Sequence, residues 1–576
     1  MNDFIFKIAG EAGQGIASAG LILSKTALRS GHFVFASSEY PSLIRGGHNV
    51  FVARIAEEAI HSLRSDVDLL IALNQNAVDL HGKELSPGAV VILNSDKAVD
   101  FGFPSGVNIF SIPLIKLAQE NGGQELMMNN VALGATIFLL GADFEILTSA
   151  IHDIFSSAKP EVIDLNIKVA RAGFDFAKEN FTESQRSGSL KAKKAAKKIL
   201  MSGNDAICLA AVAAGCKFFA AYPMTPINSM ISYLSAQAKK LGMVYFQPED
   251  EIAGINSAIG ASSAGLRSMV ATSGGGFSLM TEAFGLAGMA EVPLVIVEGQ
   301  RPGPSTGLPT WSGQGDLRFV LHASQDDFPR IILAPGDQEE CFWQTIEAFN
   351  LADKYQTPVV ILVDKFLCES QKSVVAFDES KVKINQGLRL SKEDQKKDYL
   401  RYQITESGIS PRPVIGRPGQ TFIFNSDEHD QAGFSEESSD NRKAMMEKRM
   451  RKLTTLQKEM PQPQVYGFPE ATTGLISWGS TKGAVLEAQK TLADQGVETR
   501  FLHLNYLNPF PAEAVESFLR NSQQILMIEQ NIAGQAAGLI REKTGIKIEN
   551  LLLNYDGRPI MPEEIVKRIE TLVKIK

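Results

Sequence analysis

Two loops in the middle of the sequence combine hydroxyl and cationic side chains in a way that suits an anionic substrate. The segment YPMTP (222–226) follows an apolar run, and its two prolines make a stiff turn around the Thr225 hydroxyl. The segment Gln300–Thr310 follows another apolar run and places Arg301 among prolines, glycines and hydroxyl groups. Arginine offers paired donors that match a carboxylate. Taken alone, the first segment is also an ordinary turn, and Arg301 equally suits an ion pair with Glu298.

A third segment supplies carboxyl groups. Gln247-Pro-Glu249-Asp-Glu251 opens a helical pattern of small residues, AGINSAIGASSAG. Acids in a first helical turn usually complement the helix dipole, and that interpretation stays open for Glu251. The neighbouring sequence favours a ligand site, because small residues allow another backbone to approach closely. A glycine-rich turn, Ser273–Gly276, also lies one strand later.

The N-terminal part carries two further glycine-containing segments. Gly10-x-x-Gly13-x-Gly15 lies between an apolar run and a helical pattern, where a nucleotide phosphate would bind. Its spacing differs from the dinucleotide pattern G-x-G-x-x-G, and no acid is placed to bind a ribose. A tight structural turn is at least as good an interpretation. The loop Ser38–His48 contains Arg45 before two glycines, which suits an anionic group and a domain contact equally well.

Alternating strands and helices must position these segments. In the first third of the chain, apolar runs alternate with helical stretches, and this pattern is typical of a parallel α/β sheet. The runs are Phe4–Ala9, Asn49–Arg54, Leu69–Leu73 and Ala89–Leu93, with a helix from Ile16 to about Ser30.

The central part predicts one βαβ crossover. Its expected elements are a strand at Arg267–Ser273, a turn at Gly274–Gly276, a helix at Phe277–Ala290 and a strand at Pro293–Gly299. A third α/β unit is expected after about Gly474. Its elements are the strand in LISWGS, a helix at Ala484–Gln495 and strands at Thr499–Leu504 and Gln524–Glu529.

The expected domains are 1–183, a linker at 184–202, a second domain at 203–380, a connection at 381–465 and a third domain at 466–576. The Lys/Ala-rich linker favours a solvated helix over a basic contact for a partner. The connection is polar and rich in charges and prolines, which predicts a charged helix without a core of its own.

Composition excludes several classes of function. A net charge of −8 over 576 residues argues against nucleic acid as the main partner. No apolar run reaches the ~18 residues of a membrane helix, and the start MNDFIFKIAG lacks the basic region of a secretory signal, so we expect a cytoplasmic protein. The four cysteines show no C-x-x-C spacing, which favours small core residues over a disulfide framework or a metal site in this chain.

Together the motifs resemble the alpha subunits of 2-oxoacid:ferredoxin oxidoreductases, in particular the 2-oxoglutarate type with the gamma domain fused at its N-terminus. The similar segments are YPMTP, EDEIAGINSAIGASSAG, TSGGGFSLMTE and QRPGPSTGLPT followed by GQGDL, while AGEAGQGIASAG and SSEYPSLIRGGHN resemble the gamma part. The resemblance covers nearly the whole chain in the family's order. Met224, where the family often has Ile, and Trp311-Ser312 depart from its pattern and concern the identity of the substrate.

The resemblance implies an α/β fold of three units: a gamma-like domain, a pyrimidine-binding domain with the thiamin-binding fold and a transketolase C-terminal-like domain. It also implies oxidative decarboxylation of a 2-oxoacid with coenzyme A to acyl-CoA, carbon dioxide and reduced ferredoxin. We expect 2-oxoglutarate ahead of pyruvate or branched-chain 2-oxoacids.

Residue by residue, the resemblance assigns two sets of contacts. Those to thiamine diphosphate are Tyr222, Pro223, Thr225, Glu251, Ser273 and Gly274. Glu251 would hydrogen-bond the pyrimidine N1′ and favour the 4′-imino tautomer. Arg301, Thr225 and Thr310 would hold the carboxylate and oxo oxygen of the substrate.

In the family a beta subunit holds the diphosphate, Mg²⁺ and a 4Fe–4S cluster. This chain has no G-D-G-x…N diphosphate motif and no cysteine cluster, so we expect no metal site of its own, a beta partner, ferredoxin as acceptor and a dimer of heterodimers. Two other classes remain as alternatives. One is an NAD(P)-dependent oxidoreductase using the N-terminal glycine turn. The other is a non-catalytic scaffold, which has no need of Thr225, Glu251, Arg301 and Thr310 together.

Overall fold

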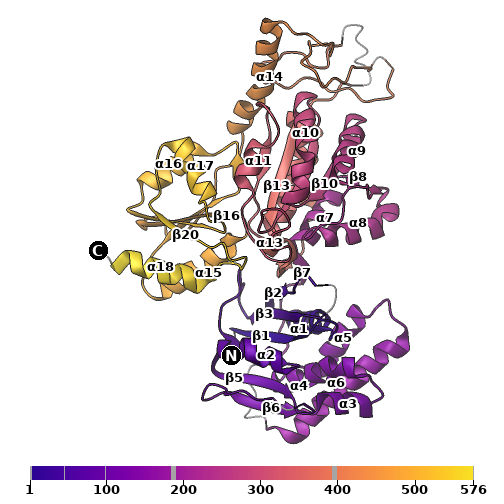
Figure 1. The fold of residues 1–576 in the computed structure, drawn as a ribbon, viewed down its shortest axis with the longest axis vertical. Helices are drawn as coiled ribbons and strands as arrows, with labels where there is room; N and C mark the ends of the chain where they lie inside the picture. Colours follow the sequence, from indigo (N-terminus) through magenta and orange to yellow (C-terminus); the bar gives the residue numbers. More distant parts are fainter. Residues whose placement is uncertain are drawn as a thin grey trace. The chain divides into compact units, whose positions relative to one another are not determined.

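The computed structural model describes residues 3–43, 46–97, 99–182, 190–391, 399–418 and 420–574. The chain divides into two compact units. The first contains residues 1–201, 369–376 and 561–564, and the second contains 202–368, 377–560 and 565–576. Three sheets covered by helices confirm the α/β class (Figure 1). None of the helices within the described ranges is both long and apolar enough to cross a bilayer.

The N-terminal unit contains a mixed sheet with the strand order β6-β5-β4-β1-β3-β2-β14-β7. Its strands are β1 (Asp3–Glu11), β2 (Phe33–Glu39), β3 (His48–Ala56), β4 (Val67–Ala72), β5 (Leu85–Asn94), β6 (Asn108–Ile112), β7 (Lys198–Ser202) and β14 (Gln371–Val375). The helices are α1 (Ile16–Arg29), α2 (Gln75–His81), α3 (Leu114–Glu120), α4 (Met128–Leu139), α5 (Phe144–Ile154) and α6 (Pro160–Asn180). α1 and α4 pack into the hydrophobic core under this sheet.

The four predicted strands of the first third are present, but the purely parallel sheet is not. β3 pairs antiparallel with both β1 and β2, and β14 pairs antiparallel with β2. Only a short loop joins Glu39 to His48, whereas a parallel connection needs a dozen or more residues. The length of that loop therefore decides the direction of β3.

The linker is not a helix in its described part. Residues 190–197 form neither a helix nor a strand, and Lys198–Ser202 forms β7. Residues 183–189 lie outside the described ranges. The segment 369–376, expected in the second domain, groups with the N-terminal unit because β14 adds to its sheet.

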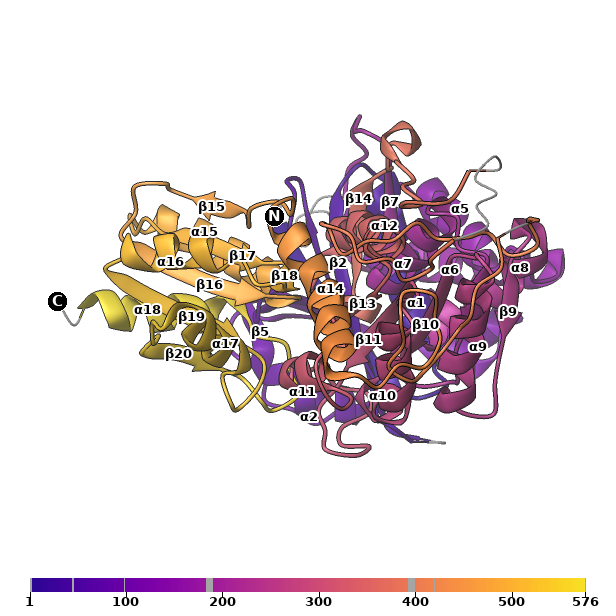
Figure 2. The same cartoon turned by 90° about the horizontal axis from the view of Figure 1, so that it is seen from above.

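The second unit contains a central sheet with the order β18-β12-β13-β11-β10-β8-β9. Its strands are β8 (Phe218–Ala220), β9 (Val244–Phe246), β10 (Ser268–Thr272), β11 (Leu294–Gln300), β12 (Ile331–Leu333), β13 (Pro358–Asp364) and β18 (Tyr506–Asn508). The helices are α7 (Gly203–Ala213), α8 (Asn228–Leu241), α9 (Glu251–Ser263), α10 (Gly274–Met289), α11 (Leu317–His322), α12 (Gln338–Tyr355) and α13 (Lys365–Glu369). Helices α9 and α10 lie side by side (Figures 1 and 2).

The predicted crossover is confirmed, with one difference. β10, α10 and β11 occupy the expected places, and β10 pairs parallel with β11. The expected turn at Gly274–Gly276 is wrong, since these glycines form the first turn of α10. Glycine is a poor helix former in general, but here its missing side chain makes room for neighbouring carboxyl groups, as described below.

The third sheet has the order β15-β17-β16-β19-β20. Its strands are β15 (Val465–Gly467), β16 (Thr473–Trp478), β17 (Arg500–Leu504), β19 (Gln524–Glu529) and β20 (Asn550–Leu553), with helices α15 (Thr481–Asp494), α16 (Ala512–Arg520), α17 (Gln535–Thr544) and α18 (Pro562–Lys574). α15 and α16 pack into different hydrophobic clusters, on opposite faces of this sheet (Figure 1).

The central and third sheets share structure. β18, which follows β17, joins the edge of the central sheet by pairing antiparallel with β12. One hydrophobic cluster contains side chains from both sheets and from the helices that cover them, including Phe277 of α10 and Trp478 of β16. The second and third expected domains are therefore parts of one packed body.

The charged connection carries the predicted helix, α14 (Ser439–Gln457). Two lysines of α14, Lys448 and Lys452, are buried, and both ammonium groups bind the carboxylate of Glu291. This pairing lowers the pKa of Glu291 against the effect of burial. A buried carboxylate between two cations fixes α14 to the end of α10.

Candidate functional site

The Thr225 turn follows β8 and is held from two sides. The side-chain amide of Asn204 donates to the Pro226 carbonyl at 2.8 Å. Pro226, whose peptide bond is cis, packs on Gly299 of β11, where a Cβ would lie 2.8 Å from the proline ring. Tyr222 is 39% exposed, so the turn presents its aromatic side chain to solvent or a partner.

Arg301 joins this turn to the end of β11. Its Nη1 donates to the Thr225 carbonyl at 3.0 Å, which brings two predicted site residues into contact. Burial lowers the pKa of Arg301, and the charge of Asp316 opposes that effect. The alternative ion pair with Glu298 is absent from the described residues. The remaining guanidinium N–H groups have no acceptor in the described part of the chain.

Glu251 is the first residue of α9 and is 4% exposed. The side chain of Asp250 caps the helix by accepting from the Ala253 amide at 2.8 Å, so the capping role belongs to Asp250. Glu251 instead faces α10: a Cβ on Gly276 would lie 2.5 Å from Glu251 Oε1. Among the described residues, no donor reaches this buried oxygen. Buried polar atoms are normally paired, so Oε1 marks a position for an external donor.

Ser273 precedes α10 and adds a second unpaired group. Its side chain makes no capping bond, and its Oγ is buried without a partner among the residues described. Gly274 begins the helix, and a Cβ there would lie 2.5 Å from Asp316 Oδ2. Two carboxyl groups therefore lie against the first turn of α10, that of Glu251 beside Gly276 and that of Asp316 beside Gly274.

Residues near the C-terminal end of the second unit bind the loop that carries Thr310. Thr310 is buried, but none of the contacts within the described residues joins its side chain to Thr225, Glu251 or Arg301. Next along the loop, the Ser312 amide donates to the Gly557 carbonyl at 3.0 Å. The Arg558 guanidinium stacks on Trp311 at 3.5 Å from the ring centre.

Gln314 fixes the same loop most firmly. Its Nε2 donates to the Trp478 carbonyl at 2.8 Å, and its Oε1 accepts from the Gln530 amide at 2.9 Å. Its backbone groups also bond to Gln530 and Asn531. This fully bonded glutamine connects the substrate-side loop to the third sheet. We did not predict that role, because the partners of Gln314 lie far away in sequence.

Three acids surround the end of β11: Glu298 and Asp364 are buried, and Asp316 is partly buried. Of these, only Glu298 has an interpretation from the sequence, as an ion-pair partner of Arg301. Burial, with the neighbouring Asp316, raises the pKa of Glu298 well above its usual range. Burial also raises the pKa of Asp316 and of Asp364. Asp316 lies inside the GQGDL segment, so that motif was the available signal.

The N-terminal glycine turn is filled by side chains of its own unit. Gly15 has φ of +69°, and Asn129 Nδ2 occupies the place of its missing side chain, 2.3 Å from a built Cβ. Asn129 also donates to the Gln14 carbonyl at 3.1 Å, and Gln14 Oε1 accepts from the Glu11 amide. These contacts favour the structural interpretation of the turn. Arg45 lies outside the described residues.

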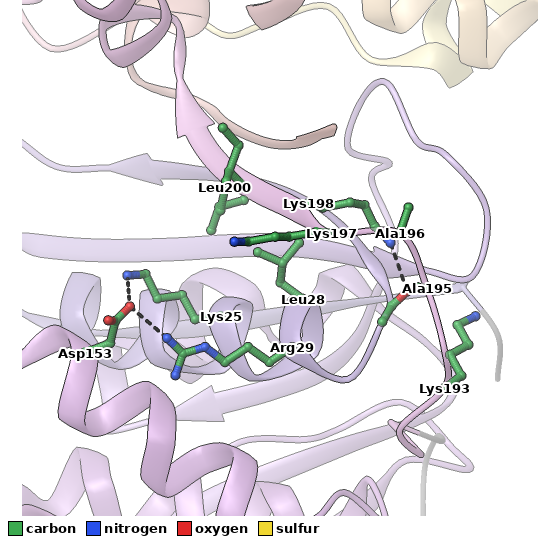
Figure 3. A pocket seen from close by; sticks show the side chains of 12 residues that line it. Lys25, Leu28, Arg29, Asp153, Lys193, Ala195, Ala196, Lys197, Lys198 and Leu200 are labelled. Carbon is green, nitrogen blue, oxygen red and sulfur yellow. Dashed lines mark hydrogen bonds and ion pairs between the residues drawn. The ribbon is translucent and has the colours of Figure 1, made fainter. Parts of the chain in front are cut away.

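A cavity of about 480 Å³ in the N-terminal unit gathers basic side chains (Figure 3). Lys25 and Arg29 both bind Asp153, at 2.6 and 3.0 Å. Lys198 donates to the Gly31 carbonyl at 3.1 Å, and Lys193 pairs with Glu57. These partners and the carbonyl end of α1 account for most of the positive charge, so the cavity is not our candidate site.

All four cysteines are buried and free, as expected for core residues. In the described ranges, no group of three or more His, Cys, Asp or Glu side chains is placed to hold a metal ion.

Three family models match successive parts of the chain. They are the pyruvate ferredoxin/flavodoxin oxidoreductase domain at 5–176, the thiamine-diphosphate-binding domain of pyruvate flavodoxin/ferredoxin oxidoreductases at 209–448, and core domain II of pyruvate:ferredoxin oxidoreductase at 471–565. The chain therefore contains a thiamine-diphosphate-binding domain, as the resemblance implied.

Whole-chain relatives agree. Subunit alpha of 2-oxoacid:ferredoxin oxidoreductase 2 from Aeropyrum pernix is 34% identical over 99% of this chain and 98% of its own length. The KorA subunit of 2-oxoglutarate synthase from Methanothermobacter thermautotrophicus is 33% identical over 64% of this chain and 97% of its own. A solved 2-oxoglutarate:ferredoxin oxidoreductase from Magnetococcus marinus, with 2-oxoglutarate, coenzyme A and succinyl-CoA bound, has a TM-score of 0.93, 33% identity and 99% coverage of both chains. The family resemblance is confirmed, and the chain belongs to the alpha subunits of the 2-oxoacid:ferredoxin oxidoreductases.

Proposed function

We propose that this subunit binds the aminopyrimidine ring of thiamine diphosphate with Glu251 and Ser273, beside Gly274 and the turn of Tyr222 and Pro223. The observation that supports this most directly is the buried Glu251 Oε1, which lacks a donor among the described residues and lies against the first turn of α10. A ring nitrogen that shares a proton with this carboxyl would satisfy it. The unpaired Ser273 Oγ offers a second hydrogen bond to the same ligand.

The substrate would be a 2-oxoacid held by Arg301, Thr225 and Thr310. Arg301 is anchored through Nη1 on the Thr225 carbonyl, so its other N–H groups can bind a carboxylate in a fixed direction. The Thr225 hydroxyl lies on the same turn. When bound, thiamine diphosphate supplies the electron sink that decarboxylation of a 2-oxoacid requires.

2-Oxoglutarate is the proposed substrate, with pyruvate and branched-chain 2-oxoacids as alternatives. The KorA relatives and the 2-oxoglutarate-bound enzyme from Magnetococcus marinus support this choice. Coenzyme A would accept the acyl group, as the succinyl-CoA in that structure suggests for its own enzyme. Ferredoxin would accept the electrons.

The complete enzyme would need a beta subunit that carries Mg²⁺ and a 4Fe–4S cluster, in a dimer of heterodimers. Family membership supports this division of labour. Four free, buried cysteines are consistent with a reducing compartment, and we propose the cytoplasm. The domain boundaries 1–183, 203–380 and 466–576 remain our proposed limits of the three family domains.

The test is anaerobic co-production with the candidate beta subunit. Reduction of ferredoxin would be followed with coenzyme A and a panel of 2-oxoacids, for the wild type and for Glu251→Ala and Arg301→Ala. Loss of a charged contact made in the transition state should lower the rate by roughly a hundredfold or more. Glu282→Ala, an exposed acid of α10, is the matched control and should keep full activity. Full activity in both site variants would contradict the assignment.

A further inference from the structure

The buried Glu298 and the partly buried Asp316 form a carboxyl pair near the proposed substrate arginine. Glu298 lies on β11, is 0% exposed and pairs in the sheet with Thr272, next to Ser273. Neither of its carboxyl oxygens has a donor among the described residues other than the carboxyl of Asp316, with which it is in hydrogen-bond contact. Two ionised carboxylates in such contact repel strongly, so one of them must carry a proton.

The surroundings decide which acid is neutral. The carboxyl of Asp316 lies beside Gly274, the first residue of α10, where the helix dipole favours an anion. The positive charge of Arg301 also stabilises an ionised Asp316. Its amide donates to Gln300 Oε1 at 3.1 Å, which fixes the residue. Among the described residues, the charges that act on Glu298 are those of Asp316 and Asp364. Asp364 itself accepts hydrogen bonds from Ser312 Oγ and the Leu367 amide.

We propose that Glu298 is a positioning residue that stays a neutral carboxylic acid and donates its proton in a hydrogen bond to Asp316. The single negative charge of the pair then lies on Asp316, where its field stabilises the positive charge of Arg301 without a direct contact. Glu298 acts through Asp316 and does not touch the substrate. This inference rests on the proposed function, because it assigns the purpose of Arg301 to substrate binding.

The kinetic test uses the assembled enzyme. Glu298→Gln keeps a donor of similar shape, so KM for the 2-oxoacid should stay within about twofold of the wild type. Asp316→Asn removes the charge that stabilises Arg301, and KM for the 2-oxoacid should rise by about tenfold while KM for coenzyme A is unchanged. An unchanged or lower 2-oxoacid KM in Asp316→Asn would overturn the proposal.

The protonation test needs no activity. Infrared spectra of the full chain at neutral pH should contain the carbonyl stretch of a neutral carboxylic acid that Glu298→Gln removes and Glu282→Gln, an exposed control, leaves in place. Spectra of the wild type and Glu298→Gln that do not differ in this band would show an ionised Glu298 and overturn the proposal. If the assembled wild-type enzyme oxidises no 2-oxoacid, the proposed function fails, whereas this spectrum still decides the state of Glu298.

The pH dependence of stability gives a third readout. The folded pKa of Glu298 lies above its unfolded value, so its contribution to stability is complete below the unfolded pKa and is lost as pH rises toward the folded one. The groups that face it are Asp316 and Asp364. Relative to the wild type, Glu298→Gln should therefore become more stable between pH 5 and pH 8 in urea unfolding of the full chain. A constant difference over that range would contradict a neutral Glu298.

Discussion

Two glycine-rich segments of this protein follow a strand, one just before α1 and the other in the first turn of α10, and the space beside their glycines is used differently. At the N-terminal turn, the amide of Asn129 fills the place beside Gly15. At the start of α10, the carboxyl of Glu251 fills the place beside Gly276 and keeps one oxygen unpaired in the described part of the chain. A glycine-rich segment indicates that another group packs closely against the backbone. The identity of that group decides whether the segment is structural or binds a ligand.

The largest expected effect comes from Gly276→Ala. The new Cβ would lie 2.0 Å from Thr272 Oγ1 and 2.5 Å from Glu251 Oε1, so the carboxyl must move. A displacement of about 1 Å at a catalytic group costs on the order of a hundredfold in rate. Ferredoxin reduction with 2-oxoglutarate measures this loss.

Gly275→Ala is the matched control for that variant. Apart from the backbone of its own helix turn and its two chain neighbours, no atom of the described residues lies within 4 Å of a Cβ at Gly275, and alanine restricts the unfolded chain. We expect full activity and a free energy of unfolding that is unchanged or higher by about 0.5 kcal/mol. Equal losses of activity in both variants would mean that Gly276 matters for the helix and not for Glu251.

A smaller effect, on stability alone, is expected for Gly15→Ala. The residue would adopt φ of +69°, which costs roughly 1–2 kcal/mol for an L-residue, and it would collide with Asn129. Urea unfolding should show the loss, while the assembled enzyme keeps its KM for the 2-oxoacid at a temperature where it is folded. Adding Asn129→Ala should recover the collision part of the loss but not the backbone part. A large rise in the 2-oxoacid KM would instead make the N-terminal turn part of the substrate site.

The smallest effect concerns pH near the same turn. His48 lies opposite Glu11 in the sheet, and its Nε2 is 2.8 Å from His81 Nε2, with Lys7 and Glu84 nearby. Burial lowers the pKa of His48 from 6.5 to about 4. Between these values the unfolded chain binds a proton that the folded chain does not, so stability is lost as pH falls from 6.5 toward 4.

His48→Gln should reduce that sensitivity. The decrease in the free energy of unfolding from pH 7 to pH 5.5, measured in urea, should be smaller in the variant than in the wild type. An identical decrease would show that His48 titrates normally in the folded chain.

The sequence was sufficient for local features and for the family. A strand and a helix lie on either side of Ser273 as expected. Arg301 contacts Thr225 because the two residues follow β11 and β8, which flank β10 as parallel strands. The turn at Gly274–Gly276 was wrong, since glycine usually ends helices and only its neighbours, Glu251 and Asp316, explain its presence in α10.

Features that depend on distant pairing could not be predicted. Nothing near Gln371–Val375 in the sequence indicates that it pairs with β2, and nothing near Tyr506–Asn508 indicates that it completes the central sheet. The bonds of Gln314 and the proton shared by Glu298 and Asp316 depend on the same long-range packing. Helix α14 has a composition typical of surface helices, and only the position of Glu291 reveals that two of its lysines are buried.

The return of β14 to the N-terminal sheet has a consequence for synthesis. While the ribosome makes the chain, β2 and β3 emerge early, but the strand that covers the free edge of β2 follows more than three hundred residues later. Until then that edge exposes unpaired backbone groups, which can pair with another nascent chain. Residues 1–201 produced alone would keep the open edge permanently and should aggregate more readily than the full chain.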